Sequence, residues 1–236
     1  QIKEQDEAPK LYPNLVTTGH RVSQLFGYKA IGFFKDEADI AASPTQNFST
    51  VKPGDIKYRD VNGDNIIDAN DKVAIGYSTT CPEIYYSLHL GAEWKGIGFY
   101  AMFQGTGNYS AVLDTKSMYW PLINNTNISQ YAYDNRWTPQ NQNAKFPRLS
   151  SQSNANNYQT STLWLADRSF LKLRNLEVYY KLPASWLKKT KIVNAAKLYV
   201  RGIDLFSFDH IDENDPEAYG INPMTKSVAL GLSVTF

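Results

Sequence analysis

The C-terminal stretch Lys226-Ser-Val-Ala-Leu-Gly-Leu-Ser-Val-Thr-Phe236 decides the fold that the sequence predicts. Successive side chains of a β-strand point to opposite faces, so this stretch presents one apolar face and one face of small or polar residues. A strand of about 9 to 11 residues is also the length that a tilted crossing of a bilayer requires. The stretch alone leaves two interpretations open, a strand of a transmembrane β-barrel or a strand of a β-sandwich. The apolar face consists of Val228, Leu230, Leu232, Val234 and Phe236.

The same alternation recurs upstream and predicts four further strands. Residues 84–94 and 97–107 form an expected hairpin around a very short connection, with aromatic residues near the strand ends. Residues 169–182 and 197–208 form a second pair, and together with residues 226–236 they give five strands. The predicted fold class is therefore all-β.

The alternation is interrupted in the second pair. Lys172 and Arg174 continue the apolar side of their strand, and Asp204 falls in register with apolar residues of the next. Because charged side chains are costly in hydrocarbon, we expect Lys172 and Arg174 to lie beyond the hydrocarbon band of the membrane.

The composition excludes several classes of protein. The chain of 236 residues has a net charge of +1, which gives no reason to expect a nucleic-acid partner. Its single cysteine, Cys81, excludes an internal disulfide framework. No apolar run of about 18 residues is present, which excludes a transmembrane helix, whereas alternating barrel strands average out to a polar composition.

The lengths of the connections favour a barrel over a sandwich. The connections after residues 94 and 182 are short or moderate, whereas loops 108–168 and 209–225 are long and polar. Outer-membrane barrels have short periplasmic turns and long extracellular loops. Five strands cannot close a barrel, so we expect other polypeptide to complete it. Residues 1–82 read as extracellular loop material, and a chain that starts at Gln1 reads as a fragment.

Residues 60–71 resemble a twelve-residue calcium loop. Oxygen-bearing side chains stand at positions 1, 3, 5, 9 and 12, and a backbone carbonyl is available at position 7. Asn65 replaces the usual glycine at position 6, and the last ligand is an aspartate in place of glutamate. The alternative is an Asx-rich turn that holds no metal. The expected Ca²⁺ ligands are Asp60, Asn62, Asp64, Ile66, Asp68 and Asp71.

No residue constellation predicts catalysis, so we expect a protein that is not an enzyme. The three histidines are scattered, and the acidic residues of loop 209–225 are typical of a solvated loop. Aromatic residues of the long loop could stack on a ligand or a partner, or could pack inside a folded loop. These candidates are Tyr119, Trp120, Trp137 and Trp164.

Several short motifs, in this order and spacing, resemble the C-terminal region of SusC-like TonB-dependent transporters of the SusC/RagA type. The resemblance extends over nearly the whole chain from Phe26. The motifs are Phe26-Gly-Tyr-Lys29, Gly32-Phe-Phe34, Pro53-Gly-Asp-Ile-Lys-Tyr-Arg-Asp60, Asn62-Gly-Asp64, Phe103-Gln-Gly105, Arg136-Trp-Thr-Pro139, Phe146-Pro-Arg-Leu149, Ser169-Phe-Leu-Lys-Leu-Arg-Asn175, Leu182-Pro183, Asp215-Pro-Glu217 and the last strand.

The resemblance implies the wall of a roughly 22-stranded outer-membrane barrel with a plug, in a Bacteroidetes-like Gram-negative bacterium. It implies uptake of glycans or peptides, a SusD-like surface lipoprotein and energy from the TonB complex. The partners of this chain would be the remainder of the barrel, the plug and membrane lipid. The residues of the last apolar face would be the signal for the barrel-assembly machinery. The alternative outside this family is a secreted, calcium-stabilised β-sandwich that binds carbohydrate.

Overall fold

The computed structural model describes residues 1–116, 118–123, 126–152, 154–188, 192–220, 222 and 224–236. It divides into two compact units. The sheet unit consists of residues 82–109 and 167–236, and the loop unit consists of residues 1–81 and 110–166. Among the described residues, no helix combines the length and the apolar character needed to span a membrane.

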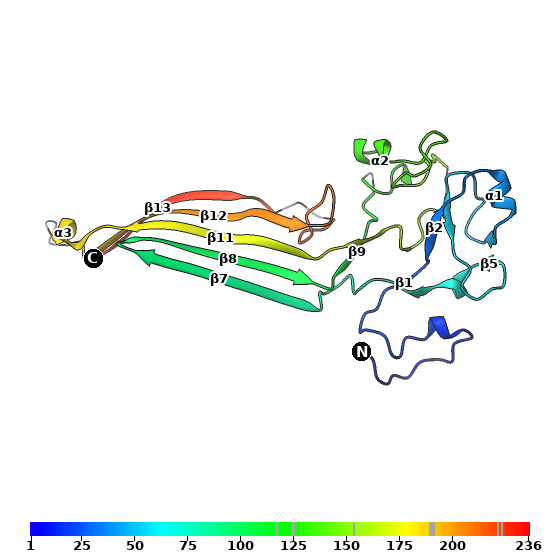
Figure 1. Cartoon of the computed structure of the whole chain (residues 1–236), viewed down its shortest axis with the longest axis horizontal. Helices are drawn as coiled ribbons and strands as arrows, with labels where there is room; N and C mark the ends of the chain where they lie inside the picture. Colours follow the sequence, from blue (N-terminus) through cyan, green and yellow to red (C-terminus); the bar gives the residue numbers. More distant parts are fainter. Residues whose placement is uncertain (117, 124–125, 153, 189–191, 221, 223) are drawn as a thin grey trace. The chain divides into compact units, whose positions relative to one another are not determined.

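The sheet unit is built on one five-stranded antiparallel sheet in the order β13-β12-β11-β8-β7 (Figure 1). Each strand agrees with an expected strand to within two residues at either end, because period-2 alternation marks each of them even where charged residues interrupt it in β11 and β12. The bounds are Ile84–Trp94 for β7, Ile97–Gly107 for β8, Phe170–Lys181 for β11, Ala195–Asp209 for β12 and Ser227–Thr235 for β13.

The short connections of the sheet lie at one end. β7 and β8 are joined by Lys95 and Gly96, which both have positive φ angles, 50° and 85°, as a two-residue type I′ turn requires. The short helix α3 (Ala184–Leu187) lies in the connection from β11 to β12, and the C-terminal end of β13 reaches the same end. The long connections, after β8 and after β12, start from the opposite end.

A β-bulge explains the interrupted alternation, and it corrects our interpretation of Lys172 and Arg174. Leu173 pairs with Phe103 and Asn175 pairs with Met102, so Arg174 is an extra residue in β11. An extra residue moves the following side chains to the other face of the sheet. Leu173 therefore shares the apolar face with Leu176, and Lys172 lies on the polar face.

Asp204 also lies in the bulge. It has a φ angle of 51°, and the pairing of β12 with β11 jumps from Ile203 to Phe206 around it. The bulge thus accounts for the charged residues that interrupt the alternation of β11 and β12. A position beyond the hydrocarbon band of the membrane is not needed to explain them.

The loop unit contains short elements only. Its short strands lie in small pairs, such as β1 with β6 and β2 with β4. The bounds are Pro13–Leu15 for the 3-10 helix η1, Phe26–Gly27 for β1, Ala30–Phe33 for β2, Glu37–Ala41 for α1, Thr45–Gln46 for β3, Ile56–Tyr58 for β4, Ile66–Ile67 for β5, Ala69–Asp71 for the 3-10 helix η2, Val73–Ala74 for β6, Ser110–Val112 for β9 and Gln130–Asp134 for α2. β10 (Leu165–Asp167) pairs with β9, and its last residue, Asp167, is the first residue of the second segment of the sheet unit.

A buried carboxylate holds distant parts of the loop unit together. Asp55 is fully buried, and its Oδ1 accepts hydrogen bonds from Asn154 Nδ2 at 2.9 Å and from Asn157 Nδ2 at 2.8 Å. Its Oδ2 accepts from Lys52 N at 2.8 Å, and Arg148 completes the site as an ion-pair partner at 2.8 Å. A buried charge is stable only when paired and hydrogen-bonded, and this one is.

These contacts change the expected division of the chain. We expected residues 1–82 as one region and grouped loop 108–168 with the strands. Instead, residues 110–166 pack with residues 1–81, because Asp55 and β4 need partners from that loop. The open edge of β4 is satisfied by side-chain amides, since Asn157 Oδ1 accepts from Ile56 N and Gln46 Oε1 accepts from Tyr58 N.

Candidate functional site

The sheet has one apolar face that is open to its surroundings. Cross-strand pairs place whole rows of apolar side chains side by side, such as the row of Leu88, Phe103, Leu173 and Phe206. Large exposed apolar patches mark surfaces that bind protein or membrane. The exposed members in the strands include Ile84, Tyr86, Leu88, Leu90, Trp94, Ile97, Phe99, Val178, Leu198, Val200, Phe206, Phe208, Val228, Leu230 and Leu232.

The opposite face of the same sheet is polar and charged. One residue along from the apolar row, the row of Ser87, Gln104, Lys172 and Ser207 crosses the same four strands. Nearer the short turns, Glu177 accepts from Lys197 Nζ at 2.8 Å across to the neighbouring strand. An apolar face backed by a polar face is the pattern of a barrel wall between lipid and an aqueous lumen.

Aromatic rings on the polar face lie over glycines of neighbouring strands. A Cβ at Gly98 would lie 2.4 Å from the ring of Tyr179, and one at Gly231 would lie 2.3 Å from the ring of Tyr199. Only glycine leaves room for a ring lying against the sheet at these positions. Lys197 Nζ lies 5.1 Å from both ring centroids, within the range of a cation–π contact.

Both outer strands of the sheet have one edge that pairs with no other strand in the described part of the chain, because β7 and β13 end the strand order. Unpaired backbone groups at a sheet edge are a ready template for a further strand. The residues expected as the assembly signal lie on β13 or follow it, and Val228, Leu230, Leu232 and Phe236 are 62–75% exposed. Val234 is half-buried.

The carboxylates of the acidic loop 60–71 bind backbone amides. Asp60 accepts from Gly63 N at 2.6 Å and from Asn65 N at 2.8 Å, and Asp71 accepts from Val61 N at 2.7 Å and from Asp68 N at 2.9 Å. These contacts belong to the Asx-rich turn that the sequence left as the alternative.

The remaining expected ligands do not gather into a metal site. Asp64 accepts from Ile66 N at 2.9 Å, Asn62 accepts from Asp64 N at 3.2 Å and Asp68 accepts from Asn70 N at 2.8 Å. Over the residues that the structure describes, no group of three or more histidine, cysteine or acidic side chains is placed to hold a metal ion. Calcium binding by the loop stays a prediction.

The aromatic candidates of the long loop lie mostly inside the loop unit. Trp164 is 0% exposed, Tyr119 1% and Trp137 6%, while Trp120 is half-buried. Trp164 stacks on Phe146 at 5.8 Å between ring centroids, and Trp164 Nε1 donates to Asn157 O at 2.7 Å. This burial is what the packing interpretation predicts.

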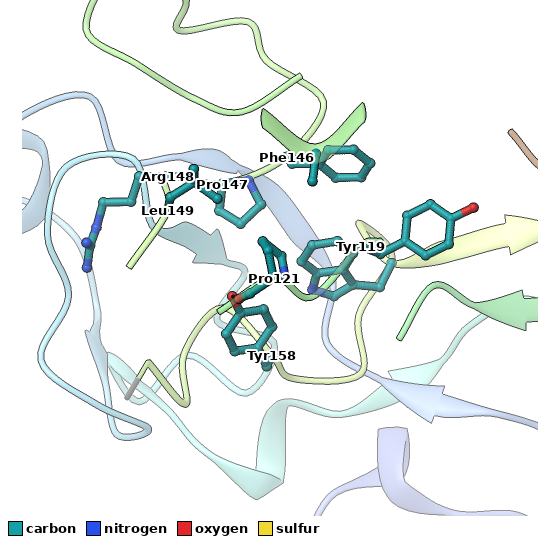
Figure 2. Close-up of a pocket in the computed structure, with 9 residues that line it drawn as sticks. Tyr119, Pro121, Phe146, Pro147, Arg148, Leu149 and Tyr158 are labelled. Atoms are coloured by element: carbon teal, nitrogen blue, oxygen red, sulfur yellow. Dashed lines mark hydrogen bonds between the residues drawn. The ribbon is translucent and has the colours of Figure 1, made fainter. Parts of the chain in front are cut away.

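A small cavity lies within this aromatic cluster (Figure 2). Its volume of about 10 Å³ has room for roughly one water molecule, which is too small for a sugar or a peptide. Burial raises the pKa of Tyr158, on its wall, to about 12, with a smaller contribution from the negative charge of Asp55. The cluster therefore packs inside the loop unit, and ligand or partner binding by its aromatic candidates stays a prediction. The other residues lining the cavity are Tyr119, Pro121, Ala132, Phe146, Pro147, Arg148, Leu149 and Trp164.

Sequence reasoning missed a charged cluster on the polar face of the sheet. Lys172 Nζ lies 2.7 Å from Asp215 Oδ1 and 3.2 Å from Glu217 Oε2, and Arg174 Nη2 lies 2.8 Å from Glu217 Oε1. We read the acidic loop as solvated, whereas Asp215 is half-buried and its partner Lys172 is 3% exposed. The available signal was the pair of basic residues that broke the strand pattern.

The fold of the chain is similar to part of solved transporter structures. A solved structure titled "Structure of the RagAB peptide transporter" matches 90% of this chain with a TM-score of 0.67 and 24% sequence identity. A second, titled "Structure of the RagAB peptide importer in the 'open-open' state", matches with a TM-score of 0.63 and 21% identity. At these identities the match establishes the fold.

Curated relatives confirm the resemblance to SusC-like TonB-dependent transporters. TonB-dependent receptor P26 of Formosa agariphila is 28% identical over 92% of this chain, and TonB-dependent receptor P3 of the same organism is 23% identical over 94%. The chain spans 23% of the length of each. No protein-family model matches the chain. These relatives are named as receptors, which points away from an enzyme.

Proposed function

We propose that this chain is a wall segment of a TonB-dependent nutrient importer in the outer membrane of a Bacteroidetes-like bacterium. Its sheet crosses the membrane with the apolar face toward lipid and the polar face toward the lumen. The remaining strands, which would complete a roughly 22-stranded barrel, and the plug come from the rest of a longer protein. Transport belongs to that whole assembly.

The observation that carries this proposal is the open apolar face. Leu230 is 73% exposed and Val228 is 72% exposed, and each is flanked along β13 by a small or polar residue on the other face. In water, a patch of this size would cause association, whereas in a bilayer the same patch is solvated by acyl chains. Strands of 11 residues such as β7 reach roughly 36 Å, enough for a tilted crossing.

The relatives support a proposal for the partners and the cargo. TonB-dependent receptors suggest energy from the TonB complex, and the RagAB pairing suggests a SusD-like surface lipoprotein at the extracellular mouth. The titles of the solved structures name a peptide transporter, which favours peptide, while glycan remains the other candidate cargo of this family. The exposed edge residues of β13 would be read by the barrel-assembly machinery.

Cysteine accessibility tests the orientation of the sheet in outer membranes. Leu230→Cys and Ala229→Cys are neighbours on opposite faces, each made with Cys81→Ser to remove the native thiol. We expect a membrane-impermeant maleimide to label Ala229→Cys after the outer membrane is opened, and to leave Leu230→Cys unlabelled until detergent is added. Equal labelling of both without detergent would overturn the proposal.

Companion proteins test the assembly. Outer membranes washed with alkaline carbonate and extracted with detergent should retain this chain within a larger barrel-and-plug polypeptide, together with a surface lipoprotein, as identified by mass spectrometry. Release of the chain alone into the wash would contradict the importer.

The alternative, a secreted calcium-stabilised sandwich, requires a second sheet over the apolar face. The described residues place the sheet unit on a single sheet and leave that face exposed, which favours the barrel wall.

A further inference from the structure

The connection from β12 to β13 folds back over the polar face of the sheet. Two neighbouring antiparallel strands can be joined by two to five residues, and this connection runs from Asp209 to Ser227. Part of it is buried, since Ile211 is 5% exposed and Ala218 is 4% exposed, and Pro216 is fully buried. The extra residues of this connection are therefore packed within the sheet unit.

Two basic residues of β11 hold this segment by its carboxylates. Lys172 binds both Asp215 and Glu217, and Arg174 binds Glu217 while its Nη1 lies 2.6 Å from Asp204 Oδ1. Arg174 Nε also donates to Gln104 Oε1 at 3.0 Å. Because the bulge directs Arg174 toward the polar face, both cations of β11 point at the same loop segment.

A third basic residue holds the backbone of the segment. Arg168 Nε donates to Pro216 O at 2.6 Å, and its guanidinium lies 4.6 Å from the ring centroid of Tyr109 and 5.5 Å from that of Tyr219. The contacts to Pro216, Glu217 and Tyr219 fix consecutive parts of one short stretch. Residues 211–219 are thus attached by charge on one side and by packing on the other.

We propose that residues 211–219 form an electrostatic latch that holds the loop between β12 and β13 against the lumen-facing wall. That this wall faces the lumen rests on the proposed function. The latch deepens that function, because a loop held against the wall restricts the lumen there. Release of Asp215 and Glu217 from Lys172 and Arg174 would free the loop without changing any strand. The latch is a conformational element of this chain, and it needs no ligand.

Labelling of a buried loop position tests the latch. Ala218→Cys, in a Cys81→Ser background, reports release of the segment in outer membranes or detergent-solubilised protein. We expect Asp215→Asn with Glu217→Gln to raise the maleimide labelling rate at least tenfold, because both changes remove charge and keep side-chain shape. Glu213→Gln, an exposed residue of the same loop, is the matched control and should leave the rate unchanged. Met224→Cys, at a 47% exposed residue, gives the rate of an open position.

A second readout protects the test against effects of the cysteine. In the native sequence, cleavage after Glu213 by a glutamate-specific protease should quicken in Asp215→Asn with Glu217→Gln. The latch is refuted if the double variant is labelled no faster than Glu213→Gln, or if it is cleaved after Glu213 no faster than the native sequence. It is also refuted if Ala218→Cys already reacts as fast as Met224→Cys. Neither assay depends on lipid exposure of Leu230, so failure of the latch and failure of the importer are separate results.

Discussion

The two faces of β7 allow a direct measurement of where the membrane lies. Leu88 and Ser87 are neighbours in the middle of this strand. Leu88 lies in the apolar row with Phe103 and Leu173, and Ser87 lies in the polar row with Gln104. The same substitution to arginine at the two positions therefore differs only in the face on which the charge is placed.

We expect Leu88→Arg to lower the free energy of unfolding by about 2–4 kcal/mol, the cost of arginine on the lipid face near the bilayer midplane. Since about 1.4 kcal/mol corresponds to a tenfold change, the folding equilibrium should fall roughly 30- to 700-fold. Ser87→Arg should change the free energy by less than about 1 kcal/mol, because its charge stays in water.

The assay is unfolding by guanidinium of the assembled protein in lipid bilayers, followed by tryptophan fluorescence. The slope of the unfolding curve must be the same for both variants if their midpoints are to be compared. Equal losses for the two variants, or a larger loss for Ser87→Arg, would refute the assignment of the faces. If both variants lose stability in bilayers but not in detergent, the loss reflects a defect in assembly and not the burial of a charge in lipid.

Three further predictions concern the loops. Asp55→Ala should destabilise the loop unit by about 3–5 kcal/mol, because the cationic partner Arg148 loses its buried counter-charge; faster proteolysis of residues 110–166 checks this, and Asp55→Asn should cost less. Burial alone would raise the pKa of Asp215 and Glu217, but bonds to lysine and arginine hold the pKa of each carboxylate below its usual value. Protection of the loop amides should therefore persist above the unfolded pKa of about 4 and be lost as pH falls through the lower folded pKa values. Hydrogen exchange at pH 7 and pH 3, compared with an unfolded reference at each pH, measures this protection, and equal protection at both would contradict the prediction. Chelation of calcium separates the two interpretations of residues 60–71: an Asx-rich turn, in which Asp60 accepts backbone amides, predicts an unchanged melting temperature, whereas a calcium-dependent rise that Asp60→Ala abolishes would establish the metal site.

The strands could be predicted because their signal is local. The alternation through residues 84–94 and 226–236 is continuous, and Lys95-Gly96 is a turn that two consecutive residues define. The bulge could not be predicted in this way. One extra residue in β11 leaves the same sequence pattern as two charged residues on the apolar face, and only the partners of Leu173 and Asn175 distinguish the two.

Contacts between residues that are far apart in the sequence could not be predicted from it. Asp55 meets Asn154 and Asn157 across about a hundred residues, and no local pattern indicates which carboxylate is buried. The same limit applies to Trp164, whose aromatic ring is equally compatible with ligand stacking and with core packing until its exposure of 0% is known.

The sequence by itself determined the strand content, the two faces of the regular strands and the resemblance to outer-membrane transporters, because each of these is encoded in period, turn residues and motif order along the chain. Tertiary structure alone decided that Asp55 meets Asn154 and Asn157, and that Asp215 and Glu217 bind Lys172 and Arg174. The physical reason is that the partner of a charged group is set by distance in space, and the fold brings together groups that the sequence separates.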